Sequence, residues 1–346
     1  MGGILKALVH TKPYVLEYRD HPDPQVGEDD VLVRVKACGI CGSDVAGFTG
    51  KTGRRIPPII MGHEAAGVVE RTGRNVTGFA VGDRICFDST VYCNQCPACR
   101  QGLYNRCVKR QVLGVSVPEF RRHGAFAEFV AVPHWICAKL PENMSFVQAA
   151  LLEPASIGVH AANRSPMSKG STAVVIGAGT IGLFILQAAK LRGARTIACD
   201  INDFRLDLAG RVGADACLNA GKVDLQQEIQ KRTDGRGADV AFEAVGYGET
   251  FRQAVSLTKT GGHVVAVGNV QKDIEIDLQE LVSRELTFTG SYASSGEFRA
   301  CIGLIAEGKI DVQPLISEVL PLKEGPAAFQ RLLDGKENLL KIVLEP

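Results

Sequence analysis

Four cysteines lie within fifteen residues of this chain, at Cys93, Cys96, Cys99 and Cys107. The spacing C-x2-C-x2-C-x7-C suits a zinc ion, which binds four thiolates tetrahedrally. Two-residue gaps let a loop turn its sulfurs toward one point, so we expect a structural zinc site at about residues 93–107. The alternatives are an iron–sulfur cluster, which thiolates also hold, free thiols or two disulfides.

A glycine-rich turn at residues 177–182 could bind a dinucleotide. Gly177, Gly179 and Gly182 follow an apolar run, Thr172–Ile176, and open an expected helix. In such a turn the first glycine allows the bend, the second lets a pyrophosphate approach, and the third lets helix and strand pack closely. The helix N-terminus then offers free N–H groups to the phosphates. An ordinary tight turn is the alternative, and the strand before and helix after favour the dinucleotide site.

An acidic residue ends the next expected strand. Asp200 follows Gly182 by eighteen residues, where a carboxylate accepts hydrogen bonds from ribose hydroxyls. It would repel a 2′-phosphate, so the sequence favours NAD over NADP. Arg205 lies nearby and could accept a phosphate or stack on the adenine.

A second group of candidate metal ligands is spread widely along the chain. Cys41 stands in Gly-Ile-Cys-Gly-Ser-Asp, His63 and Glu64 are adjacent, and Glu153 precedes Pro154. A lone cysteine is usually a core residue and a lone glutamate is usually solvated. Spacing alone therefore does not establish that these four residues share a metal.

Composition narrows the class of protein. The chain has 346 residues, of which 39 are basic and 38 acidic, and this balance argues against a nucleic-acid surface. Eleven cysteines cannot all pair, and the N-terminus resembles no signal peptide, so we expect a reducing cytoplasm. Residues 170–189 carry no charge, but their β-branched run and glycines predict a buried strand, turn and helix rather than a membrane span.

Two domains are expected from the length and from a change in pattern near Glu153. Short β-like runs separated by Gly and Pro come first, at 31–35, 65–69 and 127–132. Strands then alternate with helices, which indicates a parallel sheet covered on both faces. The expected strands and helices are 172–176, 181–192, 196–200, 204–212, 239–243, 263–268 and 286–289, with two helices and a strand at 341–344 after them.

Taken together, these motifs resemble the zinc-dependent medium-chain alcohol dehydrogenases over nearly the whole chain. The shared motifs are Cys-Gly-Ser-Asp at 41–44, Gly-His-Glu at 62–64, the four-cysteine segment, Glu-Pro at 153–154, GAGTIG, Asp200, and the segments 267–269, 290–292 and 341–344. Glu64 and Glu153 resemble most the polyol branch, which includes sorbitol and galactitol-1-phosphate dehydrogenases. The resemblance implies a GroES-like β-rich catalytic domain at 1–153, a doubly wound Rossmann NAD-binding domain at 154–293, and a segment 294–346 that returns to the catalytic domain.

The resemblance also implies the roles of single residues. Cys41 and His63 would bind a catalytic zinc, with Glu64 and Glu153 as direct or water-linked ligands. Asp44 would orient His63, and Ser43 would take the alcohol proton. Two zinc ions and NAD are thus expected. The expected cofactor-binding residues are Gly177, Gly179, Thr180, Ile181, Gly182, Asp200, Arg205, Val245, Val267, Gly268, Asn269, Ser291 and Tyr292.

One departure and several alternatives stay open. Many relatives carry His three residues after Ser43, at the outer end of a proton relay, and this chain has Ala46. The first hypothesis is oxidation of a secondary alcohol, a polyol or sugar alcohol, to a ketone. L-Threonine 3-dehydrogenase and 2,3-butanediol dehydrogenase are the near alternatives, and a non-catalytic nucleotide-binding relative or a zinc-finger nucleic-acid binder are the distant ones.

Two further hypotheses concern partners. Arg121 and Arg122 could hold the phosphate of a phosphorylated polyol, although a charge pair is more often solvated. The strand expected at 286–289 could pair across a two-fold axis, so a homodimer or homotetramer is expected, with no nucleic-acid or membrane partner.

Overall fold

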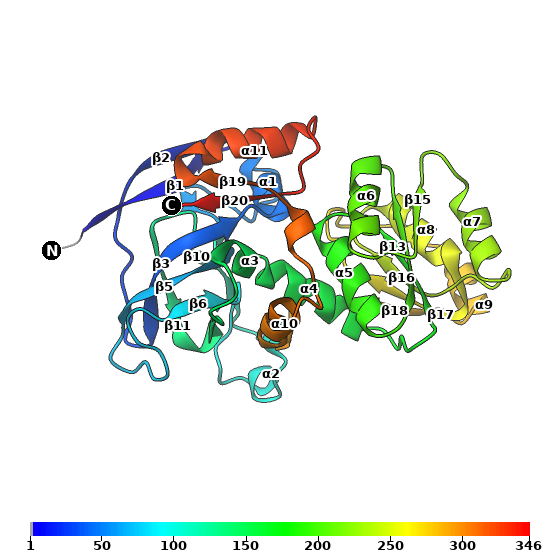
Figure 1. Cartoon of the computed structure of the whole chain (residues 1–346), viewed down its shortest axis with the longest axis horizontal. Helices are drawn as coiled ribbons and strands as arrows, with labels where there is room; N and C mark the ends of the chain where they lie inside the picture. The colour runs from blue at the N-terminus through cyan, green and yellow to red at the C-terminus, as the bar shows by residue number, and fades with distance from the viewer. Residues whose placement is uncertain (1–2) are drawn as a thin grey trace. The chain divides into compact units, whose positions relative to one another are not determined.

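The computed structural model describes residues 3–346, and the chain divides into two compact units (Figure 1). The first comprises the chain up to Glu153, with Phe298–Ala306 and Leu315–Pro346. The second comprises Pro154–Glu297 and Glu307–Pro314. The division by function into 1–153, 154–293 and 294–346 stays a prediction.

The first unit is rich in β-structure, as its sequence pattern predicts. A seven-stranded sheet has the order β12-β6-β5-β3-β20-β19, with β11 also paired to β3. A smaller sheet has the order β2-β1-β4, and two two-stranded sheets pair β9 with β10 and β7 with β8. The strands are β1 (Ile4–Lys12), β2 (Val15–Pro22), β3 (Asp30–Gly39), β4 (Ile59–Ile60), β5 (Glu64–Thr72), β6 (Arg84–Phe87), β7 (Thr90–Val91), β8 (Gln111–Val112), β9 (Val115–Val117), β10 (Phe120–Arg122), β11 (Phe129–Pro133), β12 (Cys137–Lys139), β19 (Ile316–Pro321) and β20 (Lys341–Glu345).

Strand β3 brings distant parts of the chain together at its end. Gly39, its last residue, pairs with Glu64 of β5 on one side and with Val343 of β20 on the other. The antiparallel register therefore places the start of β5 and the start of β20 beside the residues that follow β3. A side chain at Gly39 would meet Glu64, since an added Cβ would lie 2.4 Å from Glu64 Oε2.

Short helices complete this unit. The helix α11 contacts β2 and α1, and Figure 1 shows it alongside β2. The helices are α1 (Gly42–Phe48), α2 (Pro97–Arg100), α3 (Phe146–Ala150), α10 (Glu297–Ala306) and α11 (Gly325–Asp334), and α4 (Leu152–Asn163) begins in this unit.

The second unit is a six-stranded sheet in which every pair of neighbours is parallel. Its order is β15-β14-β13-β16-β17-β18, the order of the doubly wound dinucleotide-binding fold. The centre of the sheet is apolar and buried, at residues 173–176 of β13 and 240–242 of β16, which is typical of a sheet covered on both faces. The strands are β13 (Thr172–Ile176), β14 (Arg195–Asp200), β15 (Ala216–Asn219), β16 (Ala238–Glu243), β17 (Thr258–Ala266) and β18 (Thr287–Gly290).

Helices pack on this sheet as the crossover connections require. Helix α5 contacts β13 and β14, α6 contacts β14 and β15, and α8 contacts β16 and β17 (Figure 1). The helices of this unit are α5 (Thr180–Leu191), α6 (Asp203–Arg211), α7 (Leu225–Arg232), α8 (Gly248–Leu257) and α9 (Leu278–Ser283). The predicted two-domain α/β architecture is confirmed, and β13 has the predicted bounds. Strand β15 and helices α7, α8 and α9 were not predicted.

Among residues 3–346, no helix is long and apolar enough to cross a membrane.

Candidate metal centres and dinucleotide site

The four-cysteine segment folds into one candidate metal site. The sulfurs of Cys93, Cys96, Cys99 and Cys107 all lie within 4.8 Å of one another. The backbone N–H of Cys93 donates to Cys107 Sγ at 3.3 Å, and Cys96 Sγ lies 3.5 Å from Cys99 Sγ. Backbone donors, first that of Cys99, lower the pKa of Cys96 to about 6, whereas burial raises the pKa of Cys99 to about 12. Four converging thiols with backbone donors fit a closed tetrahedral zinc site.

The second predicted metal site also comes together in the first unit. Cys41 directly precedes α1, His63 directly precedes β5, and Glu64 is the first residue of β5. The pairing of β3 with β5 brings the three residues together. Ligand atoms of these three residues lie within 4.8 Å of one another. A cysteine, a histidine and a carboxylate suit zinc with an open coordination position.

Glu153 lies outside that group of three. It is in the first turn of α4, buried, and its Oε1 accepts a hydrogen bond from Ser89 Oγ at 2.6 Å. Burial raises the pKa of Glu153 to about 7, with His63 opposing this and Glu64 adding to it. These influences place Glu153 in the electrostatic surroundings of His63 and Glu64, and its role as a zinc ligand stays a prediction.

Asp44 lies beside His63. Its Oδ2 lies 3.4 Å from His63 Nδ1, and the residue is fully buried. Burial alone would raise the pKa of Asp44, but the charges and hydrogen bonds of His63 and Arg55 outweigh it and hold the pKa well below its usual range. Asp44 is therefore an ionised group that can orient the imidazole through Nδ1. Ser43 is exposed, and its Oγ lies 3.3 Å from Cys41 Sγ.

Two basic residues complete this site, and no sequence motif predicted either of them. Lys341 is buried, and its Nζ donates to Glu64 Oε2 at 2.7 Å, to Oε1 at 3.0 Å and to the carbonyl of Ile40 at 2.9 Å. Burial would lower the pKa of Lys341, but the Glu64 charge outweighs it and the pKa is raised. Arg55 pairs with Asp44 at 3.0 Å, also buried. No local signal marks either residue, because long-range strand pairing and loop anchoring bring each to its acid.

The glycine turn of the second unit has the predicted form. Gly177 has a positive φ of 95°, and a Cβ at Gly182 would lie 1.8 Å from the Gly177 carbonyl oxygen. Both positions therefore require glycine. Around Gly179, the N-cap of α5, a Cβ would meet no atom within 4 Å, and no side chain caps this helix. An uncapped helix N-terminus beside open space fits a pyrophosphate.

Asp200 ends β14 beside that turn. Its Oδ2 accepts a hydrogen bond from the Ala178 N–H at 2.7 Å and its Oδ1 from the Asn202 N–H at 2.9 Å. Arg205 is half exposed and lies 3.9 Å from Asp200 Oδ2. Asp200 therefore holds the glycine turn in place, and its contact with a ribose stays a prediction.

Glu243, at the end of β16, also holds a loop through hydrogen bonds from backbone N–H groups. The sequence did not predict this role. Glu243 is buried, and its Oε1 accepts hydrogen bonds from the N–H groups of Val245 and Gly246 and from Thr250 Oγ1, at 2.7–2.9 Å. It thereby shapes the loop at the carboxyl edge of the sheet. The other predicted cofactor residues follow strands at this same edge: Val245 after β16, Val267, Gly268 and Asn269 after β17, and Ser291 and Tyr292 after β18.

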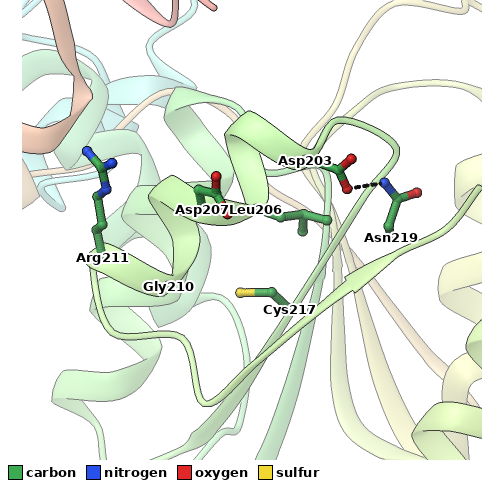
Figure 2. A pocket seen from close by; sticks show the side chains of 7 residues that line it. All are labelled: Asp203, Leu206, Asp207, Gly210, Arg211, Cys217 and Asn219. Atoms are coloured by element: carbon green, nitrogen blue, oxygen red, sulfur yellow. Dashed lines mark hydrogen bonds between the residues drawn. The ribbon is translucent and has the colours of Figure 1, made fainter. Parts of the chain in front are cut away.

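One surface hollow lies apart from these residues. It measures about 650 Å³ and is formed between α6 and β15 (Figure 2). Figure 2 shows the side chains that line it, including Asp203, which accepts a hydrogen bond from Asn219 at 2.6 Å. None of the predicted cofactor residues lines this hollow.

Comparisons with known proteins agree with both sites. Residues 27–142 match the model of the alcohol dehydrogenase GroES-like domain, and residues 180–307 match that of the zinc-binding dehydrogenases. The chain is 33% identical to sorbitol dehydrogenase of Bacillus subtilis, over 99% of this chain and 97% of that protein. It is 36% identical to L-idonate 5-dehydrogenase of Vitis vinifera, over 96% of this chain and 90% of that protein.

A solved structure is similar throughout. A zinc-binding dehydrogenase of Sinorhizobium meliloti, bound to NADP, superposes with a TM-score of 0.91 at 32% identity, covering 99% of this chain and all of that one. The predicted cofactor classes, zinc and a nicotinamide dinucleotide, are confirmed, with a four-cysteine structural site and a Cys/His/Glu catalytic site. By its fold, its metal sites and these matches, the chain belongs to the zinc-containing medium-chain alcohol and polyol dehydrogenases.

Proposed function

We propose that this enzyme oxidises a secondary hydroxyl of a polyol or sugar alcohol to a ketone, with NAD as the hydride acceptor. The observation that carries the proposal is the grouping of Cys41, His63 and Glu64 beside the exposed hydroxyl of Ser43. The named activities of the sorbitol and L-idonate relatives support a polyol as the substrate class.

We propose a separate role for each residue of the site. Cys41, His63 and Glu64 would hold the catalytic zinc, with Glu153 as a further ligand. When bound, zinc supplies a Lewis acid that acidifies a hydroxyl, and NAD accepts the hydride. Ser43 would receive the alcohol proton. Asp44 would keep His63 oriented, and Lys341 would balance the charge of Glu64.

The proposed preference for NAD rests on Asp200. Its carboxylate is buried beside the glycine turn, where a 2′-phosphate would be repelled. Arg205 does not cancel that charge, because it is 45% exposed and 3.9 Å away.

A phosphorylated substrate is not supported by Arg121 and Arg122. The two are neighbours in β10, so their side chains point to opposite faces of the hairpin. Arg121 donates to Ser116 Oγ and Arg122 donates to Gln111 Oε1, both at 3.2 Å. A phosphate held by both guanidiniums would require these contacts to break, so we propose an unphosphorylated polyol.

We also propose a homodimer or homotetramer that resides in a reducing cytoplasm. Strand β18 ends the six-stranded sheet, and Val270, Leu278 and Val282 nearby are each more than 60% exposed. None of the eleven cysteines forms a disulfide, which fits a reducing compartment. Sedimentation velocity of the purified protein would test the assembly, and a monomer at micromolar concentration would contradict it.

A substrate panel tests the proposed function. Zinc-loaded protein is incubated with NAD or NADP and with D-sorbitol, xylitol, L-idonate, galactitol 1-phosphate, L-threonine or 2,3-butanediol, and reduced cofactor is followed by absorbance. We expect kcat/KM for an unphosphorylated polyol with NAD to exceed that for threonine or butanediol by at least about tenfold, a difference of about 1.4 kcal/mol. Highest kcat/KM for threonine or butanediol would overturn the substrate class. Equal use of NAD and NADP would overturn the cofactor preference.

A further inference from the structure

Arg55 is a buried arginine that contacts two residues of the catalytic site at once. Its side chain is 5% exposed. Its Nη2 donates to Asp44 Oδ1 at 3.0 Å and lies 3.4 Å from Ser43 Oγ, and its Nε lies 3.4 Å from the same Asp44 oxygen. One guanidinium thus reaches both the group that faces His63 and the hydroxyl beside Cys41.

The loop that carries Arg55 is anchored to a strand. The Ile56 N–H donates to the Ser116 carbonyl at 3.1 Å, and the Ser116 N–H donates to the Arg54 carbonyl at 3.2 Å. The Arg55 side chain also donates to the Arg54 carbonyl through Nη1 at 3.1 Å. Backbone pairing with β9 therefore fixes the position from which the guanidinium extends.

Helix α1 leaves room for this side chain. A Cβ added at Gly47 would lie 2.2 Å from Arg55 Cγ and 3.1 Å from Arg55 Cβ, which is too close for either to stay in place. Gly47 is therefore a packing requirement of Arg55, and it offers a second way to displace the guanidinium.

The hydrogen-bonding capacity of each group sets the orientation of the Ser43 hydroxyl. An arginine only donates, whereas a serine hydroxyl has one proton and two lone pairs. Arg55 occupies one lone pair of Ser43 Oγ, and Ser43 donates toward Cys41 Sγ at 3.3 Å. One lone pair is then left to accept the proton of a substrate hydroxyl, while Ser43, which is exposed, releases its own hydroxyl proton to water. A lysine side chain is one atom shorter and has no Nε donor, so it cannot reproduce the contacts that Nη2 makes with Asp44 and Ser43 together with the Nε contact to Asp44.

We infer that Arg55 is a positioning residue for alcohol oxidation, which holds Asp44 and the Ser43 hydroxyl in the one arrangement that lets Ser43 accept the alcohol proton. This inference rests on the proposed function. The residue acts through Ser43 and Asp44, and its own side chain is buried.

The test is a double-mutant cycle between Arg55→Lys and Ser43→Ala, with Arg54→Lys as the matched control because Arg54 is the exposed neighbour. Turnover of the best polyol, zinc content and NADH affinity are measured for each protein. Arg55→Lys should lower kcat by about tenfold, with KM, zinc content and NADH affinity kept, since misplacement of one group slows the chemical step. In the Ser43→Ala background the same substitution should have little further effect, because coupled residues are not additive.

Gly47→Ala provides a second perturbation that leaves Arg55 itself in the chain. It should lower kcat in the same direction as Arg55→Lys, and the two together should be no worse than either alone. An Arg55→Lys protein with unchanged kcat, or effects of Arg55→Lys and Ser43→Ala that simply multiply, would overturn the inference. An unmodified enzyme that oxidises no alcohol would instead overturn the proposed function, so the two failures are distinguishable.

Discussion

The two units stabilise their buried carboxylates in different ways. In the first unit, Glu64 is paired with buried Lys341, and Asp44 with buried Arg55. In the second unit, Asp200 and Glu243 accept hydrogen bonds chiefly from backbone N–H groups. Both arrangements satisfy the acid, but only the first neutralises its charge with a side chain of full opposite charge.

The difference follows from what each region binds. A zinc site assembled from Cys41, His63 and Glu64 gathers negative ligands, and the two basic residues limit the charge that a bare site would accumulate. A dinucleotide edge needs loops of fixed shape, and backbone amides bonded to Asp200 and Glu243 supply that shape. Asp200 keeps its negative charge there, which is the property that selects among cofactors.

The largest expected effect is on kcat, from a substitution in the catalytic site of the first unit. Ser43→Ala should lower kcat by roughly 10²- to 10⁴-fold, the usual range for one acid–base group. NADH affinity should stay the same, because the glycine turn belongs to the other unit. Stopped-flow turnover and NADH fluorescence titration would measure the two quantities, and Thr52→Ala, an exposed hydroxyl in the loop after α1, is the control. A fully active Ser43→Ala enzyme would show that water alone takes the proton.

The next largest expected effect is on the free energy of unfolding, when the buried cation Lys341 is removed. Lys341→Met leaves Glu64 buried without its partner and should lower the free energy of unfolding by about 3–5 kcal/mol. Adding Glu64→Gln should recover most of that loss. Urea unfolding of the zinc-free proteins measures both. The matched control is Arg34→Met, which breaks an exposed pair with Glu70 in the same sheet and should cost no more than about 1 kcal/mol. Equal losses for the two substitutions would remove the distinction between buried and exposed pairs.

Glu297, in the second unit, should have a smaller effect on the free energy of unfolding, and this effect should depend on pH. Burial would raise the pKa of Glu297, but hydrogen bonds from His160 and from the Ser295 N–H outweigh it and lower the pKa to about 2. The folded state then binds fewer protons than the unfolded one, so this stabilisation is present above pH about 4.5 and is lost as the pH falls toward 2.

Glu297→Gln should therefore lower the free energy of unfolding by about 1–3 kcal/mol at pH 7. The difference from the unmodified protein should shrink below pH about 4.5. Chemical unfolding at a series of pH values measures it, and Glu249→Gln, at an exposed site, is the control. A difference that stayed constant with pH would show that the charge of Glu297 is not what stabilises the fold.

The smallest expected effect is on cofactor choice. Asp200→Ser should raise the ratio of kcat/KM for NADP to that for NAD by at least about tenfold, or about 1.4 kcal/mol. Affinity for NAD should fall as well, since Asp200 also holds the glycine turn. Asp203→Ser, an exposed acid at the start of α6, should leave the ratio unchanged. An unchanged ratio in the Asp200 variant would mean that another group selects the cofactor.

The sequence predicted features that are encoded locally. The four-cysteine segment, the glycine turn and β13 each lie in one continuous stretch, so spacing and apolar pattern were sufficient. The three-residue metal group needed the family resemblance, because Cys41 and Glu64 meet only through the pairing of β3 with β5.

The unpredicted residues depend on distant partners. Lys341 reaches Glu64 because β20 pairs beside β3, and Arg55 reaches Asp44 because its loop is anchored to β9. In the sequence Arg55 is one of two adjacent arginines, a pattern typical of a solvated surface. Helices α7 and α9 are only eight and six residues long, too short to predict from a helical period of apolar residues.

Zinc content measured together with turnover tests the central claim, that one unit carries a closed structural site and an open catalytic one. The proteins to compare are the unmodified enzyme, Cys41→Ser and Cys99→Ser. We predict two zinc ions per chain in the unmodified enzyme. Cys41→Ser should retain one zinc and the fold but lose turnover, whereas Cys99→Ser should lose the closed site and much of its stability. Iron in place of zinc, or a Cys41→Ser protein that keeps both zinc ions and full turnover, would contradict the account.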